Sequence, residues 1–345
     1  MEKIDLKEYS IFLGNPAESL SSLLAQNPGV RLFVLTDHNT KFHCLPLVEP
    51  LLRDRSWSVF SVAPGELNKN IHSCIHIWEA MTQAGLDRQA IMINLGGGII
   101  GDMGGFCAST YKRGIRFIQL PTTLLSQVDA SIGGKLGIDF EGYKNHIGVF
   151  RDPLAVLIHP DFLQTLSDRE LKSGYAEVIK HCLIADGGHW QELSGIFDLR
   201  AASWQPIIRR SLEVKRKIVS EDPFESGMRK LLNFGHTIGH ALESHYLRTD
   251  HPLLHGEAIA AGMIYETLLS NRHTGLTTDK KEAITGYIES LYGPPPAFDP
   301  DLLLPLMKQD KKNKEGKISF TLLRDIGESV WDVMLTEEEM RLIKK

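Results

Sequence analysis

The chain has 345 residues, of which 42% are hydrophobic and 23% are charged, and its formal net charge is −5. This composition is typical of a globular protein that buries a large core and divides into two domains. The negative charge argues against nucleic acid or an anionic membrane as a partner. The four cysteines form no C-x-x-C pair, and we see no signal peptide and no apolar run of membrane-spanning length. We therefore expect a cytoplasmic protein with reduced thiols.

Strand and helix signals alternate through the first half of the chain. Apolar runs predict strands at residues 9–13, 31–35, 58–62, 91–95, 116–120 and 155–158. Amphipathic segments predict helices at residues 17–25, 45–53, 71–84 and 102–111. This alternation is typical of a Rossmann-like α/β domain, which we place at residues 1–160. Such a domain has a mostly parallel sheet covered on both faces, and it binds ligands at the carboxyl ends of the strands.

Strand signals nearly vanish after residue 160. Helical periodicity predicts helices at residues 168–184, 206–220, 229–246, 257–271, 280–291 and 300–307. Asp299 can cap the last of these helices, residues 318–322 alternate like a hairpin strand, and Thr336 with Glu339 forms a capping box. The predicted fold is thus a Rossmann-like α/β domain followed by an all-α or mainly helical domain, residues 161–345, with the site in the cleft between them.

A glycine-rich turn follows the predicted strand 91–95. Gly96, Gly98 and Gly101 satisfy the pattern G-x-G-x-x-G, in which backbone N–H groups approach a pyrophosphate at the positive end of a helix. The acidic residue that would bind the ribose is missing from the next strand, and the best candidate is Asp37, after the strand 31–35. The glycines alone leave two interpretations open, an NAD site and a structural turn.

Other polar residues of this half lie among glycines and turns. Those within the glycine-rich stretch are Asp129, Lys135, Lys144 and Asn145. They suggest polar groups held on loops around something anionic. Glu66 and Lys69 lie in a turn that is typical of a solvated loop, and that turn is also well placed to contact a nucleotide.

Two segments of the helical half carry groups that can bind a metal or an anion. Helical spacing puts Glu177 on one face with Lys180 and with His181, which taken alone favours an exposed ion pair. His236 and His240 are spaced i, i+4, as in many divalent-metal sites, although among fourteen histidines such a pair can arise by chance.

His255 lies at the start of another predicted helix. With Glu177 and His236 it would complete a set of two nitrogens and one oxygen, which is the arrangement of a catalytic zinc-type ion. The sequence does not show whether these three residues converge.

Seven blocks of the chain resemble, in order, the signature blocks of the 3-dehydroquinate synthases, which belong to the sugar phosphate cyclases. The blocks are GGGIIGDMGGF, YKRGIRFIQLPTTLLSQVDASIGGK, YKNHIGVF, GYAEVIKH, RKLLNFGHTIGHALE, LLHGEAIAAGM and QDKKNKEG. Within that resemblance, the family's metal ligands match Glu177, His236 and His255, for Zn²⁺ or Co²⁺, and His240 becomes an active-site residue that is not a ligand.

The resemblance also implies the other site residues. The family's NAD contacts match Asp37, Asn39, Glu66, Lys69, Gly97, Gly98, Asp102, Thr122, Thr123, Lys144 and Thr165. Its substrate contacts match Asp129, Lys135, Asn145, Lys180, Lys215, Arg229, Asn233, His240 and Lys312. Arg113 matches an arginine that reaches the substrate phosphate from the partner subunit, so a homodimer is implied.

The activity that the resemblance implies is that of a lyase of the shikimate pathway, which leads to chorismate and the aromatic amino acids. It converts 3-deoxy-D-arabino-heptulosonate 7-phosphate to 3-dehydroquinate and phosphate. NAD transiently oxidises the substrate, phosphate is eliminated, the ketone is reduced again, and an intramolecular aldol reaction closes the ring. Arginine and lysine side chains suit a substrate that carries both a carboxylate and a phosphate.

Four positions depart from the family's usual pattern and leave the fine substrate contacts open, namely Leu136, Asp139, Tyr143 and Pro223. The alternatives are another cyclase, such as one making 2-epi-5-epi-valiolone or 2-deoxy-scyllo-inosose, and a metal-dependent alcohol or glycerol dehydrogenase. A non-catalytic metabolite-binding paralogue is a further alternative, but it would be expected to lack a metal ligand or a lysine.

Overall fold

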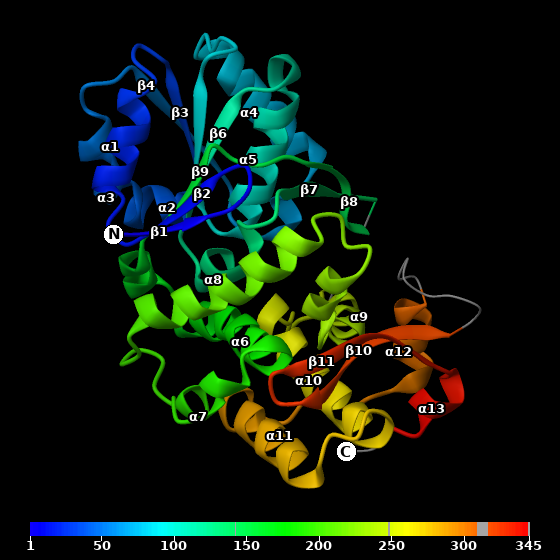
Figure 1. The fold of residues 1–345 in the computed structure, drawn as a ribbon. Coiled ribbons are helices and arrows are strands. Elements are labelled where there is room, and N and C mark those ends of the chain that lie inside the picture. Colours follow the sequence, from blue (N-terminus) through cyan, green and yellow to red (C-terminus); the bar gives the residue numbers. More distant parts are fainter. Residues whose placement is uncertain (142, 248, 309–316, 344–345) are drawn as a thin grey trace. The chain divides into compact units, whose positions relative to one another are not determined.

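The computed structural model describes residues 1–141, 143–247, 249–308 and 317–343. The chain divides into two compact units (Figure 1). Unit 1 contains residues 1–167 together with residues 204–209, and unit 2 contains residues 168–203 and 210–345. Among the described residues, no helix combines the length and the apolar composition that crossing a membrane requires.

Unit 1 is built on a seven-stranded sheet. Its strands are β1 (Glu2–Asp5), β2 (Ser10–Leu13), β3 (Leu32–Asp37), β4 (Trp57–Val62), β5 (Ile91–Gly96), β6 (Arg116–Pro121) and β9 (Ala155–Ile158). Their order across the sheet is β1-β2-β9-β6-β5-β3-β4, and all neighbours are parallel except β1 and β2. Because β3 and β5 are parallel neighbours, the end of β3 at Asp37 and the end of β5 at Gly96 lie at the same edge.

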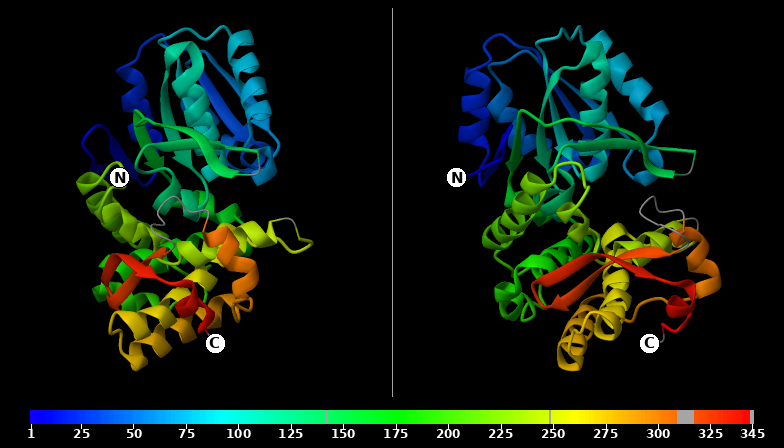
Figure 2. Two further views of the ribbon diagram at one scale, coloured as in Figure 1. Left: turned by 90° about the vertical axis from the view of Figure 1, so that its right-hand side faces the viewer. Right: turned by 45° about the vertical axis from the view of Figure 1, so that its right-hand side comes forward.

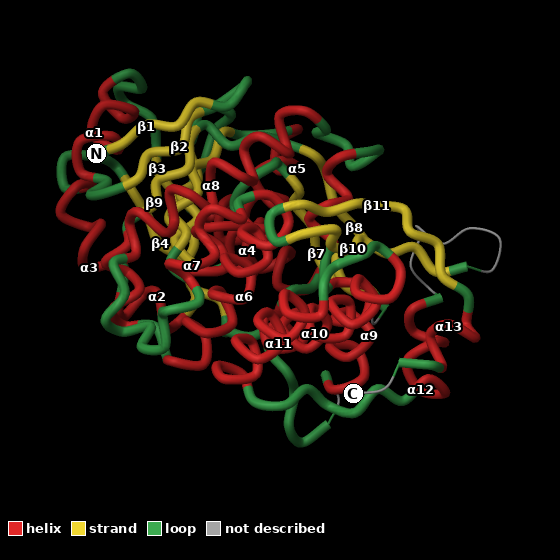
Figure 3. The backbone as a smooth tube through the Cα atoms, turned by 60° about the horizontal axis from the view of Figure 1, so that its bottom comes forward, coloured by secondary structure: helices red, strands yellow, loops and turns green. Residues whose placement is uncertain are grey.

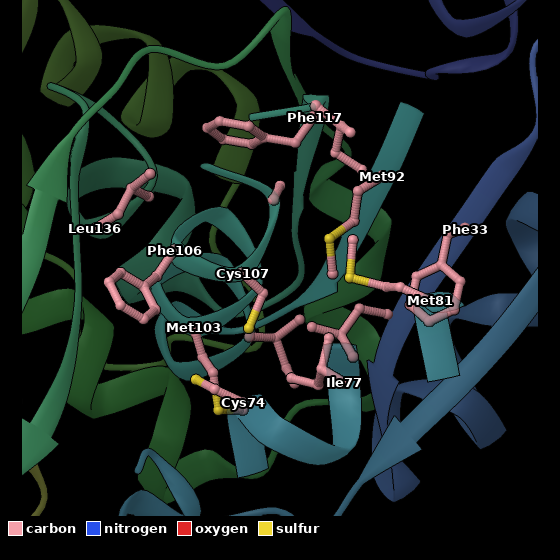
Figure 4. Packing of buried hydrophobic residues seen from close by; sticks show 14 of the residues in the cluster. Phe33, Cys74, Ile77, Met81, Met92, Met103, Phe106, Cys107, Phe117 and Leu136 are labelled. Atoms are coloured by element: carbon pink, nitrogen blue, oxygen red, sulfur yellow. The ribbon is translucent and has the colours of Figure 1, made fainter. Parts of the chain in front are cut away.

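Helices cover both faces of this sheet (Figure 1). They are α1 (Ala17–Ala25), α2 (His38–His43), α3 (Leu45–Val48), α4 (Ile71–Gln83) and α5 (Gly98–Thr110). Along β3 the side chains alternate, so Phe33 packs with α4 and α5 whereas Leu32 packs with α1 and α3. Figure 4 shows the first of these clusters, in which Phe33, Cys74 and Cys107 are buried. This burial on both faces explains the nearly continuous apolar runs of the strands.

A separate hairpin, β7 (Lys135–Phe140) and β8 (Tyr143–Phe150), follows the main sheet's β6 and packs on α5 (Figure 2). This hairpin is absent from the predicted elements, because glycines interrupt the apolar alternation of residues 133–148. The predicted start of α5 at Asp102 is wrong, since the helix begins at Gly98. The predicted helix 45–53 is wrong in part, since α3 passes into a 3-10 turn, Glu49–Leu52, that contains Pro50.

The described residues of unit 2 are mainly helical and include an antiparallel hairpin, β10 (Ile318–Asp325) and β11 (Glu328–Leu335) (Figure 3). Its helices are α6 (Asp168–Ala185), α7 (Trp190–Leu193), α9 (His236–Tyr246), α10 (His255–His273), α11 (Thr278–Tyr292), α12 (Pro300–Met307) and α13 (Glu337–Arg341), and α8 (Trp204–Glu221) begins in unit 1 and continues into unit 2. Ile238, Tyr265 and Phe320 join α9, α10 and β10 in one core. The predicted Asp299 cap and the Thr336–Glu339 capping box are confirmed.

The prediction of one helix over residues 229–246 is wrong. A 3-10 turn, Met228–Asn233, comes first, and α9 begins only at His236. Between them Gly235 has φ +79°, a left-handed conformation that ends any continuous helix. Because the apolar periodicity continues across Gly235, the periodicity alone predicted one continuous helix.

Two glycine-to-alanine substitutions should change stability in opposite directions. A Cβ at Gly104, within α5, would lie 2.8 Å from Leu35 Cδ2 and closer still to Asn94 Oδ1, whereas a Cβ at Gly286, within α11, would meet nothing within 4 Å. We expect Gly104→Ala to lower the free energy of unfolding by about 1–3 kcal/mol through overpacking. Gly286→Ala should raise it by about 0.5–1 kcal/mol, because alanine is the better helix former. Urea unfolding followed by circular dichroism measures both changes in the free energy of unfolding. Changes of the same sign in the two variants would contradict the packing described for Gly104 and Gly286.

Candidate functional site

Three side chains of unit 2 converge on a possible metal position. The ligand atoms of Glu177, His236 and His255 all lie within 4.8 Å of one another. Oε1 of Glu177 is 3.7 Å from Nε2 of His236 and 3.6 Å from Nε2 of His255. Two ligands at zinc distances in a tetrahedral site would be about 3.4 Å apart. The donor set therefore suits a divalent cation in both chemistry and spacing.

The carboxylate of Glu177 is fully buried, and so is the side chain of Lys180, with which it forms an ion pair one helical turn along α6. The helical spacing alone predicted an exposed pair here, and that prediction is wrong. His181 points elsewhere, since its Nδ1 lies 2.5 Å from Oγ of Ser211 on α8. A buried carboxylate needs positive partners in order to remain charged, and this one has the ammonium of Lys180 and the imidazole of His255 beside it.

The backbone places the two histidine ligands at the starts of their helices. His236 is the first residue of α9, and His255 is the first residue of α10. The two helices approach so closely that a Cβ at Gly262 would collide with the carbonyl oxygen of Gly235, and a Cβ at Gly239 would lie 3.0 Å from the carbonyl oxygen of Ala258. Glycines thus allow the approach that brings the two imidazoles together.

Hydrogen bonds orient both imidazoles. Nδ1 of His236 lies 3.1 Å from the carbonyl oxygen of Phe234, and Nδ1 of His255 lies 3.4 Å from Oε2 of Glu243. Each ring therefore keeps Nε2 for the position beside Glu177. Burial and the charge of Lys180 hold the pKa of His236 well below its usual range, in the neutral form that binds metals. Burial also acts to lower the pKa of His255, but Glu177 and Glu243 raise it to about 9.

A second donor set overlaps the first. His240, Glu243 and His255 also have ligand atoms within 4.8 Å of one another. The ring of His240 lies 5.0 Å from that of His236 and 5.9 Å from that of His255, centroid to centroid, and His240 is exposed. Glu243 was not among the predicted site residues. Its position three residues after His240, on the same helical face, was the signal that could have found it.

Further polar residues of unit 2 include two buried cations. Lys215 on α8 and Arg229 in the 3-10 turn are both buried. Asn233 ends that turn and donates from Nδ2 to Oε1 of Glu225 at 2.8 Å. Lys312 lies outside the described residues.

The carboxylate of Asp222 holds the loop that carries Arg229. It accepts hydrogen bonds from the backbone N–H groups of Ser226, Gly227 and Arg229 at 3.0, 2.6 and 3.1 Å. Burial acts to raise the pKa of Asp222, but these N–H groups lower it to about 2. The guanidinium of Arg229 also donates to the carbonyl oxygen of Pro223 at 2.5 Å, so the loop and the cation support each other.

In unit 1 the glycine-rich turn joins β5 to α5. Gly97 is the N-cap of α5 and Gly98 its first residue, so the backbone N–H groups at this helix start are available to an anion. A Cβ at Gly97 would lie 2.9 Å from Cγ2 of Thr123, which shows how closely the segment after β6 approaches the turn. Asp37 ends the neighbouring strand and caps α2. These positions are those of a dinucleotide site at the carboxyl edge of a parallel sheet.

A buried lysine links the loop after β4, the helix α5 and the hairpin. Nζ of Lys69 donates to Asp102 and to Oδ1 of Asn145, at 2.6 Å each. Burial acts to lower the pKa of Lys69, but Asp102 and Glu66 raise it, so this amine stays charged. Lys144 lies 3.3 Å from Glu66. The structure thus brings together five of the predicted nucleotide and substrate residues of unit 1.

Asp139, one of the four departures, supports the same cluster. Its Oδ1 accepts the backbone N–H of Asn145 at 2.8 Å, and Asn145 has φ +49°. Burial raises the pKa of this carboxyl. The carboxylate thus helps to hold Asn145 in a left-handed conformation that few side chains adopt.

The remaining predicted residues of unit 1 lie in separate turns and elements. Asn39 is in the first turn of α2, Asp129 in a π-helical turn (Ser126–Ala130), Lys135 at the start of β7, Arg113 in a 3-10 turn after α5, and Thr165 in the 3-10 segment Pro160–Thr165. Thr122 donates its backbone N–H to the carbonyl oxygen of Gly96 at 3.0 Å, so it does lie beside the glycine-rich turn.

The chain resembles one family along most of its length. Residues 59–173 match the family described as 3-dehydroquinate synthase N-terminal, and residues 174–313 match 3-dehydroquinate synthase C-terminal. The chain is 44% identical over 317 residues to the 3-dehydroquinate synthase of Parabacteroides distasonis, covering 90% of this chain and 89% of that relative. It is 40% identical over 337 residues to that of Geobacillus thermodenitrificans, covering 93% and 90%.

Solved structures share the fold. ValA (2-epi-5-epi-valiolone synthase) from Streptomyces hygroscopicus subsp. jinggangensis 5008, with NAD⁺ and Zn²⁺ bound, is 25% identical with a TM-score of 0.87, and the match covers 99% of this chain and 97% of that one. A 2-deoxy-scyllo-inosose synthase complexed with carbaglucose-6-phosphate, NAD⁺ and Co²⁺ is 22% identical with a TM-score of 0.87, and the match covers 99% of both chains. At that identity the second match supports the fold alone.

The two overlapping donor sets make different predictions for zinc binding. If Glu177, His236 and His255 hold the ion, His236→Ala should lose nearly all bound zinc, and His240→Ala should keep close to one zinc per chain. Zinc content after loading and desalting, measured by inductively coupled plasma mass spectrometry, decides between them. The reverse result would assign the ion to the set around Glu243. Circular dichroism of each variant checks that the fold persists.

Asp222 should give stability that depends on pH. Because its folded-state pKa lies near 2, below the ordinary value of 3.8, the carboxylate stabilises the fold above pH 3.8 and loses this effect as the pH falls through about 2. We expect Asp222→Asn to lower the free energy of unfolding most at neutral pH, with a smaller difference near pH 3. Urea unfolding of both proteins at several pH values measures this difference. A difference that stays constant down to pH 3 would contradict the assignment.

Proposed function

Because this chain belongs to the 3-dehydroquinate synthase family, it is an enzyme of that family, and we propose that it converts 3-deoxy-D-arabino-heptulosonate 7-phosphate to 3-dehydroquinate and phosphate. The observation that carries this proposal is the convergence of Glu177, His236 and His255 in unit 2. These residues are the ones that match the family's metal ligands, and their donor atoms suit a divalent cation.

We assign Zn²⁺ or Co²⁺ to this donor set. Of the two cyclases described above, ValA has Zn²⁺ bound and the 2-deoxy-scyllo-inosose synthase complex contains Co²⁺. Such an ion would act as a Lewis acid that binds substrate hydroxyls and acidifies them. The protein contributes one buried negative charge from Glu177 and two imidazoles whose Nδ1 atoms are engaged by Phe234 and Glu243, so the ligands are oriented before an ion arrives.

We assign NAD to the carboxyl edge of the sheet in unit 1. The helix start at Gly97 and Gly98 suits a pyrophosphate, and Asp37 at the end of β3 suits a ribose hydroxyl. The cofactor would supply a transient hydride acceptor that is regenerated in each turnover. Lys69 and Asp102 form an ion pair next to Asn145, and this largely buried pair fixes the first turns of α5 relative to the hairpin.

The buried cations of unit 2 suit a substrate that carries two anionic groups. Lys180, Lys215 and Arg229 are each at most 4% exposed. A guanidinium can bind a carboxylate or phosphate in a bidentate manner, and ammonium groups add charge at points around it. We therefore assign these side chains, with Asn233 and His240, to substrate binding.

Asp129, Lys135 and Asn145 of unit 1 are proposed as further substrate contacts. We also propose a homodimer in which Arg113 contributes to the partner's site. A cytoplasmic location is supported by the four cysteines, which are all free and buried.

The test of this function is turnover of 3-deoxy-D-arabino-heptulosonate 7-phosphate by the Zn²⁺-loaded chain with a catalytic amount of NAD. We expect stoichiometric release of phosphate, with 3-dehydroquinate identified by mass and chromatography, and inhibition by a chelator. Turnover of sedoheptulose 7-phosphate or glucose 6-phosphate instead would make the chain another cyclase of this fold. Failure with all three substrates, in protein that binds both cofactors, would favour a non-catalytic paralogue.

Lys135 and Lys41 provide a matched pair of exposed lysines. Lys135 begins β7 and is assigned to the substrate, whereas Lys41 lies on α2 and has no assigned role. We expect Lys135→Ala to lower kcat/KM by roughly 100-fold or more, which corresponds to about 2.7 kcal/mol of transition-state stabilisation. Lys41→Ala should change it less than about twofold. Initial rates of phosphate release measure both, and equal effects would remove Lys135 from the site.

A further inference from the structure

Glu266 is a fully buried glutamate on α10 that no catalytic assignment uses. Its side chain accepts two backbone hydrogen bonds from the start of α9. Oε2 accepts from the N–H of Gly235 at 2.5 Å, and Oε1 accepts from the N–H of Ile238 at 3.2 Å. The first N–H groups of a helix have no partner within the helix, and the helix dipole favours a negative charge beside them. Glu266 therefore caps α9 from a different helix.

The packing of the two helices explains why the cap comes from α10. The N-cap of α9 is Gly235, which has no side chain. A larger residue there would be strained at φ +79°, and its Cβ would lie 2.5 Å from Cγ of Met263 and 3.0 Å from the carbonyl oxygen of Ile259. The usual capping residues, serine, threonine, aspartate and asparagine, are thus excluded from this position. The close approach of α9 and α10 removes the local cap, and Glu266 replaces it.

The same contact fixes a metal ligand. His236 lies between the two residues whose N–H groups bind Glu266. His255 begins the helix that carries Glu266, about three helical turns before it. The carboxylate of Glu266 therefore joins the backbone on either side of one imidazole to the helix that bears the other.

From these contacts we propose that Glu266 is a positioning residue of the metal site, which holds His236 in the place where it shares an ion with Glu177 and His255. The inference rests on the metal assignment of the proposed function. Glu266 itself would touch neither the ion nor the substrate, and it would act through the backbone of Gly235 and Ile238.

The test uses the full chain, stripped of metal and titrated with Zn²⁺ against a chromophoric chelator, and with Co²⁺ followed by its visible absorption. Glu266→Gln keeps the size of the side chain but removes its charge and presents an amide N–H to backbone donors. We expect its Zn²⁺ affinity to fall by about 10- to 100-fold, as for other residues that orient metal ligands, and its Co²⁺ bands to change in position and intensity.

Ser270→Ala is the matched control. Ser270 lies one turn further along α10 and is buried. Its Oγ donates to the backbone carbonyl oxygen of Glu266 at 2.6 Å and accepts from the backbone N–H of Leu323 at 2.9 Å, away from α9. The Ser270→Ala variant should be less stable but keep the Zn²⁺ affinity and the Co²⁺ spectrum of the unsubstituted chain. If Ser270→Ala changes both as much as Glu266→Gln does, a general loss of stability explains the effect and the proposal is overturned.

The remaining outcomes are also decisive. Unchanged Zn²⁺ affinity and an unchanged Co²⁺ spectrum in Glu266→Gln would overturn the proposal. If that variant does not fold, Glu266→Asp takes its place, because it keeps the charge and shortens the reach; it should show a smaller loss in the same direction, and no loss would overturn the proposal. Failure of the unsubstituted chain to bind either ion would instead remove the metal assignment itself.

Discussion

The buried carboxylate of Glu177 sets the requirement that organises unit 2. A carboxylate without solvent is stable only among positive charges and hydrogen-bond donors. Lys180 supplies one charge from the same helix, and two imidazoles face the other side of the carboxylate. A divalent ion would complete this compensation. At this proposed metal position, part of the cost of burying Glu177 would therefore be offset only when an ion binds.

Glycines allow the two histidines to reach the carboxylate of Glu177. Gly235, Gly239 and Gly262 have no side chains to hold α9 and α10 apart, and the two helices bring their first residues, both histidines, to the same carboxylate. In unit 1 the glycines have a different use, because Gly97 and Gly98 free the start of α5 for an anion. In one unit glycine lets two helices meet, and in the other it exposes backbone N–H groups to a ligand.

The sequence predicted the parts of this protein that depend on local patterns. The parallel strands and most helices follow from apolar periodicity, and Asp299 and Thr336 follow from capping chemistry. Contacts between distant segments could not be predicted in this way. Glu177 and Lys180 have the spacing of a surface ion pair, and only the packing of α6 shows that they are buried. The break at Gly235 interrupts no apolar pattern. The sequence does not distinguish Glu266 from other helical glutamates, because its contact with the start of α9 depends on the packing of two helices. Convergence of the three ligands was predicted through the family resemblance, since their spacing along the chain contains no such information.

The departures from the family pattern can be interpreted in the same physical terms. The carboxylate of Asp139 accepts the backbone N–H of Asn145, whose amide oxygen in turn accepts from Lys69. At Pro223 the carbonyl oxygen accepts from Arg229, an interaction that does not require a particular side chain. Asp139 and Pro223 thus each hold a predicted site residue, Asp139 through its carboxylate and Pro223 through its backbone carbonyl oxygen. A change at such a position can be accommodated because several side chains can provide one acceptor, whereas the donor set of Glu177, His236 and His255 has no such freedom. For this reason, we expect related enzymes to vary more at positions such as Asp139 and Pro223 than at the residues that these positions hold, Asn145 and Arg229.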